Sequence, residues 1–121
     1  MVAALFDTNI LIDYLNGIPQ AREELGLYEE RAISIVTWME VMVGASAPLA
    51  DATRSFLAGF EVIQLNETVA EKAVELRRMH RIKLPDAIIW ASADIRGAIL
   101  VTRNSKDFPP DNPGMRIPYQ L

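Results

Sequence analysis

Residues 2–9 read VAALFDTN, an uninterrupted apolar run that ends in an aspartate, a threonine and an asparagine. A short apolar stretch without polar alternation is typical of a strand that is buried on both faces, as in a parallel sheet. Asp7 follows this run directly. A carboxylate at the end of a buried strand loses hydration, so it needs a hydrogen-bonding or cationic partner. The stretch therefore predicts a parallel sheet with a polar site at one end.

Helix and strand patterns alternate along the rest of the chain. We expect helices over 8–15, 20–27, 37–46, 49–58, 67–80 and 85–96, and further strands over 32–36, 60–65, 98–102 and 116–119. Strands joined through helices form right-handed crossovers in a sheet that is covered on both faces. The predicted fold is therefore one α/β domain over residues 1–121, a three-layer α/β/α sandwich with about four to five parallel strands. Ligands of such sheets bind beyond the carboxyl ends of the strands.

The composition excludes several classes of function. The chain has no cysteine, which rules out disulfides, thiolate zinc sites and a cysteine nucleophile. No segment approaches the roughly 20 apolar residues that cross a bilayer. The apolar run at residues 2–6 is too short for a signal peptide, so we expect a cytoplasmic protein without a membrane partner. The net charge of −4 argues against a basic nucleic-acid interface unless bound cations offset it.

Three acids stand beside strand ends or helix starts, and each also has a purely local explanation. Asp7 is a favoured residue for capping the helix that follows, although Thr8 could be the cap instead. Thr37 and Glu40 have the spacing of a capping box. Asp86 lies in the first turn of a helix, where a negative charge complements the helix dipole. Taken singly, none of the three establishes a site.

Together the three acids make a stronger case. Asp7 and the helix that carries Glu40 both follow strands, and parallel strands end at the same edge. The helix that begins near Asp86 must return the chain to strand 98–102, so its first turn would need a special arrangement to reach that edge. Two carboxylates about 4 Å apart repel by about 4 kcal/mol at an effective dielectric constant of about 20. A divalent cation would relieve this repulsion, and oxygen ligands favour Mg²⁺ or Mn²⁺ over zinc.

Four segments in this order resemble the PIN-domain ribonucleases, in particular the VapC toxins of bacterial type II toxin–antitoxin pairs. They are Asp7-Thr8-Asn9, Glu40, LPDAII at 84–89 and TRNSKDF at 102–108. The resemblance implies a Mg²⁺-dependent endoribonuclease that hydrolyses RNA, with tRNA or rRNA among the expected targets. It also implies a homodimer, a VapB-like antitoxin as partner in a hetero-oligomer, and a metal site formed by Asp7, Glu40 and Asp86.

The resemblance carries further residues with it. The family often has a fourth acid after the last core strand, where this chain has Asn104, with Asp107 three residues later. Asn104 is a candidate catalytic residue and Asp107 its possible substitute, which leaves open whether one metal or two are bound. Thr8 and Thr102 match hydroxyls that orient the acids or the scissile phosphate. A simple turn also explains Asn104 and the serine after it.

Basic and apolar side chains suggest where partners bind. Arg81 and Lys83 approach Asp86 in sequence, and Arg103 and Lys106 flank Asn104, so these four are candidate RNA phosphate contacts. We expect His80, the only histidine, to have a surface role. Core packing explains most of an excess of apolar residues, and some of them could instead form a homodimer face or a groove for an amphipathic antitoxin helix. These residues are Trp38, Met39, Met42, Val43, Leu49, Phe56 and Leu57.

Three other classes of protein share some of these sequence features. A receiver domain would need an acceptor aspartate at the end of strand 60–65, where this chain has Gln64-Leu65-Asn66. A phosphohydrolase with an aspartate nucleophile would want a second aspartate at position 9, which is asparagine. Both are therefore rejected. A non-catalytic RNA-binding or regulatory PIN module stays open, because Asn104 could mark a degenerate site.

Overall fold

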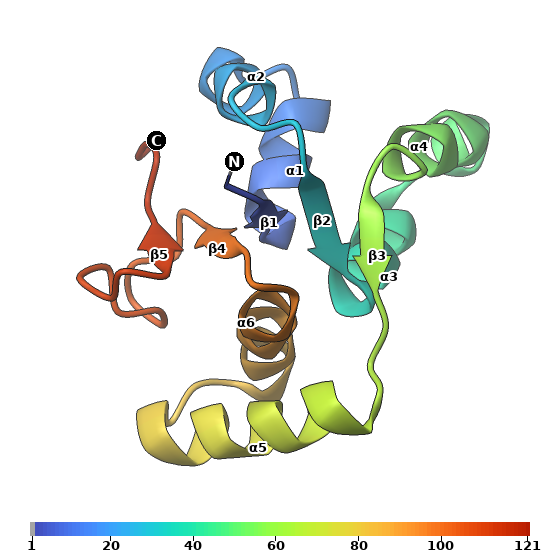
Figure 1. Ribbon diagram of the computed structural model, residues 1–121. Helices are drawn as coiled ribbons and strands as arrows, with labels where there is room; N and C mark the ends of the chain where they lie inside the picture. Colours follow the sequence, from blue (N-terminus) through green and yellow to red (C-terminus); the bar gives the residue numbers. More distant parts are fainter. Residues whose placement is uncertain (1) are drawn as a thin grey trace.

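The computed structural model describes residues 2–121, which form a five-stranded, all-parallel sheet surrounded by helices (Figure 1). The order of the strands is β3-β2-β1-β4-β5. This confirms the predicted α/β class and parallel sheet. The elements are β1 (Ala4–Phe6), α1 (Thr8–Leu15), α2 (Pro19–Gly26), β2 (Arg31–Ser34), α3 (Ile35–Gly44), a 3₁₀ turn (Ala47–Leu49), α4 (Ala50–Leu57), β3 (Glu61–Ile63), α5 (Glu67–His80), α6 (Leu84–Arg96), β4 (Ile99–Val101) and β5 (Met115–Arg116).

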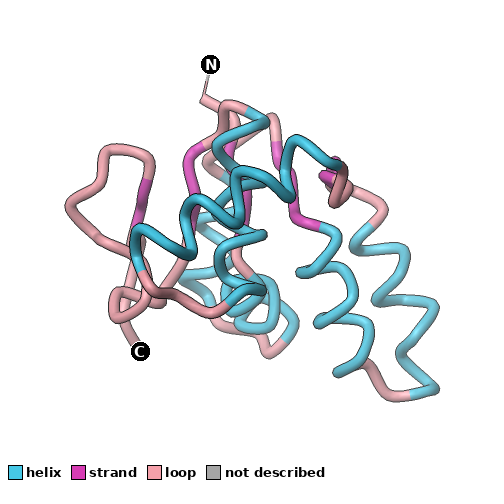
Figure 2. Tube along the Cα trace, turned by 90° about the horizontal axis from the view of Figure 1, so that it is seen from below, coloured by secondary structure: helices cyan, strands magenta, loops and turns pink. Residues whose placement is uncertain are grey.

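The apolar residues of β1 pack on both faces of the sheet, as their unbroken run predicts. Leu5 belongs to a core with the buried residues of α5 and α6. Ala4 and Phe6 belong to a second core, with residues of α1, α2, α3 and α4. Figure 1 shows α1 and α2 on the side of the sheet opposite α5 and α6. Figure 2, seen from below, shows the short strands enclosed among longer helices. The sheet is therefore the middle one of three layers.

The chain changes direction across the sheet at β1. From β1 it moves to β2 and β3 on one side, and it then returns to β4 and β5 on the other side. Phe6 and Val101 are paired, so β1 and β4 end side by side. A ligand site is expected at such a switch point, beyond the carboxyl ends of the two strands.

The start of α3 differs from the prediction. The helix begins at Ile35 rather than near Thr37, and its N-cap is Ser34, whose hydroxyl accepts from the Val36 backbone N–H at 3.1 Å. Thr37 and Glu40 therefore lie inside the helix, and the predicted capping box is wrong. The physical reason is that β2 ends two residues earlier than predicted, which gives Ser34, a good capping residue, the first position.

The helix that carries Asp86 reaches the edge of the sheet without a special arrangement, contrary to the prediction. Only two residues separate the end of α6 at Arg96 from β4, and Gly97 takes a left-handed φ of 74° in this turn. The helix therefore runs antiparallel to β4. Its 13 residues span about 20 Å, which carries its first turn back toward the carboxyl ends of the strands.

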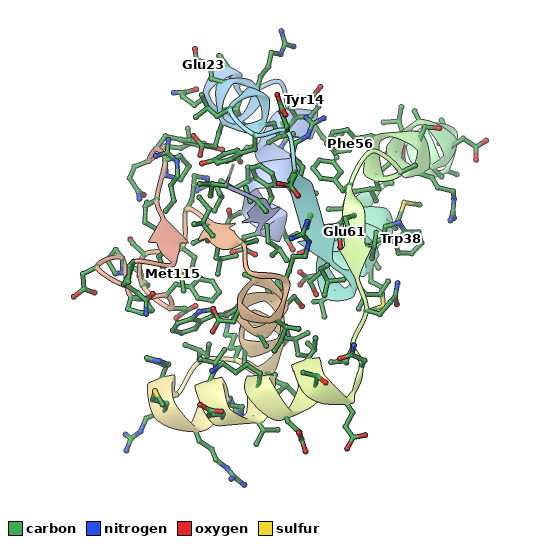
Figure 3. All side chains as sticks on the ribbon, in the orientation of Figure 1. Tyr14, Glu23, Trp38, Phe56, Glu61 and Met115 are labelled. Carbon is green, nitrogen blue, oxygen red and sulfur yellow. The ribbon has the colours of Figure 1, made fainter. Side chains whose placement is uncertain are left out.

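Two smaller features complete the architecture. The last strand is Met115–Arg116, one residue earlier and two residues shorter than predicted, and it pairs with β4. Side chains also join helices on the same face of the sheet: the rings of Tyr14 and Phe56 stack at 4.9 Å between α1 and α4 (Figure 3). No helix in the described part of the chain combines the length and hydrophobicity that a membrane crossing requires.

Candidate metal-binding active site

Folding brings the three predicted acids to one open pocket at the carboxyl edge of the sheet. Asp7 comes from the end of β1, Glu40 from α3 and Asp86 from the first turn of α6. We call this cavity of about 380 Å³ the acidic pocket. Its lining residues are Asp7, Thr8, Asn9, Ile12, Glu40, Asp86, Arg103 and Asn104. The predicted candidate Asn104 thus lies at the same pocket as the three acids.

Asp7 is the most enclosed of these acids, with 5% of its surface exposed. One carboxylate oxygen, Oδ1, accepts from the Thr8 backbone N–H at 2.7 Å, which makes Asp7 the N-cap of α1. The other oxygen, Oδ2, accepts from the Thr102 hydroxyl at 2.7 Å. The local capping explanation is therefore correct for Asp7 and not for Thr8. Capping is not the whole role of Asp7, because its carboxylate also lines the acidic pocket.

The pKa of Asp7 is raised from its usual 3.8 to about 6, and burial is the main cause. The hydrogen bonds from Thr102 and Thr8 oppose this rise, while the negative charges of Asp86 and Glu40 add to it. The fold thus holds a carboxylate where its ionised form is disfavoured. A cation in the pocket would reverse this effect, because a nearby opposite charge favours ionisation.

Asn9 connects the strand ends around Asp7, a role that sequence reasoning missed. Its Nδ2 donates to Asp7 Oδ2 at 3.2 Å and lies 3.4 Å from the Thr102 hydroxyl. Its Oδ1 accepts from the Arg103 backbone N–H at 3.2 Å. The side chain therefore links α1 to the segment after β4. The available signal was its place two residues after Asp7, on the first turn of the same helix.

Glu40 is exposed on α3 and is oriented by Thr8 rather than by its own backbone. The Thr8 hydroxyl donates to Glu40 Oε1 at 2.6 Å and lies 3.0 Å from the Thr37 hydroxyl. Thr8 and Thr102 thus each hold one acid of the pocket. The roles of these two hydroxyls in catalysis stay a prediction of the sequence resemblance.

Asp86 is partly buried, and its pKa is raised above the usual value. Burial is the main cause; the charges of Asp107 and Glu40 raise the pKa further, and Lys83 lowers it. Asp107 therefore lies within electrostatic reach of the site although it does not line the pocket. Asp107 is engaged with its own loop, since its carboxylate accepts from Asn104 Nδ2 at 3.0 Å and its backbone N–H donates to Asn104 Oδ1 at 3.2 Å.

The basic candidates occupy different environments. The guanidinium of Arg103 donates to both carboxylate oxygens of Asp13, a buried acid of α1 that also accepts from the Tyr119 hydroxyl at 2.8 Å. The charge of Arg103 is thus neutralised at the rim of the pocket. Arg81 and Lys83 are exposed in the segment before α6 and do not line the acidic pocket. Lys106 lines a second cavity together with Asn104.

His80 and the predicted apolar surface are also placed by the structure. His80 is partly buried and packs on Trp90, with their ring centroids 4.5 Å apart, so it lies away from the lining of the acidic pocket. Leu57 is fully buried in the core. By contrast, Met39 and Val43 are exposed on α3. Therefore only some of the apolar residues that the sequence suggested for a partner surface are exposed.

The side chains fit a hard divalent cation by their chemistry, because the pocket offers carboxylate, hydroxyl and amide oxygens. Arg103 is the only basic residue that lines it within residues 2–121, and Asp13 already neutralises its charge. In that range no three His, Cys, Asp or Glu side chains are grouped closely enough to hold a metal ion as they stand. The acids thus share a pocket without forming a complete coordination shell.

Comparison with known proteins assigns the chain to a family. The PIN-domain profile matches residues 4–109. The chain belongs to the PIN-domain family. Among its relatives, Ribonuclease VapC10 from Mycobacterium tuberculosis is 34% identical over 113 residues, which cover 87% of this chain and 85% of the relative.

Solved structures with the same PIN fold include toxin–antitoxin complexes. One from Klebsiella pneumoniae has 45% sequence identity and a TM-score of 0.94, and the match covers 98% of this chain and all of that chain. A DNA-bound VapBC complex from Salmonella typhimurium has 26% identity and a TM-score of 0.76, with 96% of both chains covered. PIN ribonucleases generally use divalent metal ions, in agreement with the acids that converge in this PIN domain. Homology to a named ribonuclease supports the same class of activity.

Proposed function

We propose that this protein is a divalent-metal-dependent endoribonuclease, and that it serves as the toxin of a type II toxin–antitoxin pair. The observation that carries the proposal is the convergence of Asp7, Glu40 and Asp86 on one pocket of a VapC-like PIN domain. Mg²⁺ or Mn²⁺ is the proposed cofactor, because the pocket presents only oxygen ligands. The proposed site of action is the cytoplasm, on RNA such as tRNA or rRNA.

Each residue of the pocket has a distinct task in this proposal. Asp7, Glu40 and Asp86 hold the cation, and Asn104 supplies an amide oxygen or binds the substrate. A bound divalent cation would lower the pKa of a water molecule and offset the charge that develops on the departing oxygen. The ionised carboxylates can accept the proton of the attacking water. Thr8, Thr102 and Asn9 keep the carboxylates in orientation.

Cleavage of a 5′-labelled single-stranded RNA by the purified protein tests the nuclease. We expect cleavage with Mg²⁺ or Mn²⁺, none with EDTA, and a loss of at least about 100-fold in Asp86→Asn, as for removal of a group that acts in the transition state. Asp94→Asn is the matched control, since Asp94 is an exposed acid on the same helix. Expression in bacteria with mapping of RNA 5′ ends should give growth arrest and discrete new ends only with an intact site. Equal cleavage by Asp86→Asn would refute the proposed acidic site, and no cleavage by the unaltered protein with either metal would refute the nuclease and leave a binding module.

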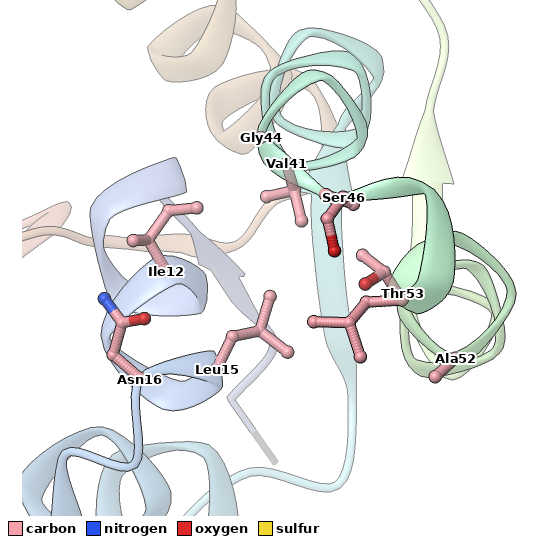
Figure 4. A pocket seen from close by; sticks show the side chains of 10 residues that line it. Ile12, Leu15, Asn16, Val41, Gly44, Ser46, Ala52 and Thr53 are labelled. Carbon is pink, nitrogen blue, oxygen red and sulfur yellow. The ribbon is translucent and has the colours of Figure 1, made fainter.

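An apolar groove beside the acidic pocket supports an antitoxin partner. It encloses about 430 Å³ between α1, α3 and α4, where Leu15 faces Val41 and Thr53 (Figure 4). Ile12 lines both this groove and the acidic pocket, so the two are neighbours. The structural relatives from Klebsiella pneumoniae and Salmonella typhimurium are a toxin–antitoxin complex and a DNA-bound VapBC complex. We propose that an amphipathic helix of a VapB-like antitoxin occupies the groove and that its continuation covers the acids.

Two substitutions test the proposed assembly. Leu15→Glu should weaken the complex with the antitoxin chain of the Klebsiella relative and leave RNA cleavage intact, because Leu15 lines only the groove. We also propose a homodimer through the exposed Met39 and Val43 of α3. Light scattering should then show a dimer that Val43→Glu converts to a monomer. An unchanged complex or an unchanged mass contradicts the corresponding interface.

A further inference from the structure

A second pocket adjoins the acidic pocket and has a different chemical character. This adjacent pocket encloses about 340 Å³. Its lining residues are Asn9, Arg103, Asn104, Ser105, Lys106 and Gln120, the first three of which also line the acidic pocket. The two cavities therefore open side by side along one wall. Among the described residues no carboxylate lines the adjacent pocket.

Some side chains that line the adjacent pocket already form polar contacts within the protein, and others do not. Asn9, Arg103 and Asn104 are occupied by hydrogen bonds or by an ion pair within the protein. Within residues 2–121, the side chains of Ser105, Lys106 and Gln120 form no such contact. A hydroxyl, an ammonium and an amide thus remain available to a ligand. These groups suit a phosphate together with the polar edge of a sugar or base.

Neighbouring contacts hold the two backbone segments that form this pocket. The loop that carries Lys106 is closed by the paired hydrogen bonds between Asn104 and Asp107 and is anchored by Phe108, which is 1% exposed and packs edge-on against Trp90. The segment that carries Gln120 is tied to α1 by the neighbouring Tyr119 hydroxyl. Preformed walls lower the entropy lost on binding, which favours a ligand site over a mobile surface.

We propose that the adjacent pocket binds one nucleotide of single-stranded RNA next to the phosphodiester that is cleaved. Lys106 contacts the phosphate of this nucleotide, and Ser105 and Gln120 hydrogen-bond its ribose or base. This subsite rests on the proposed ribonuclease function, whose acids mark the neighbouring cavity as the place of reaction. A single strand is required because the bases of a duplex are stacked and cannot be splayed into a pocket.

Binding of a short fluorescent single-stranded RNA in EDTA tests the subsite. The variants are Lys106→Gln and Gln120→Ala, and Lys72→Gln is the charge-matched control on α5. We expect Lys106→Gln to weaken binding about fivefold and to reduce the magnitude of the slope of log K against log[salt] by about 0.7, the value for one phosphate contact on a single strand. With Mg²⁺, KM should rise by a similar factor. Gln120→Ala should weaken binding of the single strand and leave binding of the matching duplex unchanged.

The outcomes separate this inference from the nuclease itself. Cleavage by the unaltered protein, with affinity, salt slope and KM unchanged in Lys106→Gln, overturns the subsite and leaves the nuclease standing. Lys106-dependent RNA binding without cleavage supports the subsite and overturns the nuclease. Equal weakening of single-strand binding by Lys72→Gln shows a general charge effect and overturns the assignment to this pocket.

Discussion

Replacing Asp7 by asparagine should stabilise the metal-free protein at neutral pH while it abolishes activity. Asp7 is 5% exposed, and burial raises its pKa from 3.8 to about 6. The ionised carboxylate is therefore less stable in the folded protein than in the unfolded chain. At about 1.4 kcal/mol per pKa unit, the folded state loses about 3 kcal/mol when Asp7 ionises. Asparagine has nearly the same shape and carries no charge.

A lost hydrogen bond opposes part of this gain. Asp7 Oδ2 accepts from both the Thr102 hydroxyl and Asn9 Nδ2. In Asp7→Asn one carboxylate oxygen becomes an NH₂ group, which cannot accept from Asn9 Nδ2, whereas the Thr102 hydroxyl can turn and accept from the amide, so that one hydrogen bond is lost. A typical intramolecular hydrogen bond contributes about 1 kcal/mol. The expected net gain in the free energy of unfolding is therefore about 2 kcal/mol at a pH well above 6.

The stability difference between Asp7→Asn and the unaltered protein depends on pH. Because the pKa of Asp7 is raised in the folded state, the protonated carboxyl stabilises the protein relative to the ionised one. This stability is fully present below the unfolded pKa of 3.8, and it is lost as the pH rises through about 6. The advantage of Asp7→Asn should therefore vanish toward about pH 4, where only the lost hydrogen bond is left.

Urea unfolding in EDTA at about pH 7.5 and about pH 4 measures the difference. At the higher pH, a gain of about 2 kcal/mol should also appear as a melting temperature raised by roughly 5–10 °C. Mn²⁺ or Mg²⁺ should then stabilise the unaltered protein and have little effect on the variant, because binding to the folded state adds stability. Asp111→Asn, in an exposed loop, is the control. A variant that is less stable than the unaltered protein in EDTA at the higher pH refutes the reasoning.

Two further predictions concern the contacts around this acid. Asp13→Asn should lower the free energy of unfolding by about 3 kcal/mol, because it leaves Arg103 without its buried, charged partner. The control is Glu61→Gln, which breaks an exposed ion pair with Arg96 and should lower the free energy of unfolding much less in the same urea assay. Thr102→Val removes a hydrogen bond that lowers the pKa of Asp7, so the acidic limb of the pH–rate profile should move to higher pH. Thr53→Val should leave the profile unchanged, and identical profiles for both variants would contradict the role of Thr102.

Local sequence determined much of the fold. The apolar run before Asp7 is too short for a typical buried helix and therefore predicts a buried strand, and the helices follow from apolar spacing and from residues such as Pro85 in a first turn. The chemistry of the candidate ligand atoms was also predicted at this level, since a chain without cysteine and with three acids beside strand ends or helix starts offers mainly oxygen to a cation. The sequence predicted the boundaries of the elements less accurately: Ser34 caps α3, whereas the predicted start of this helix was near Thr37.

Only the tertiary structure decided how these groups meet. Thr102 and Asp7 are 95 residues apart and bond directly, because β4 lies beside β1 in the sheet. Thr8 reaches Glu40 across 32 residues, and Asp13 neutralises the charge of Arg103 at the rim of the acidic pocket. The order of the strands and the direction of the helices determine which residues form such pairs, and no single segment of the sequence determines either of them. The sequence by itself determined which chemical groups are present, and the packing of the helices on the sheet determined which of them share a pocket.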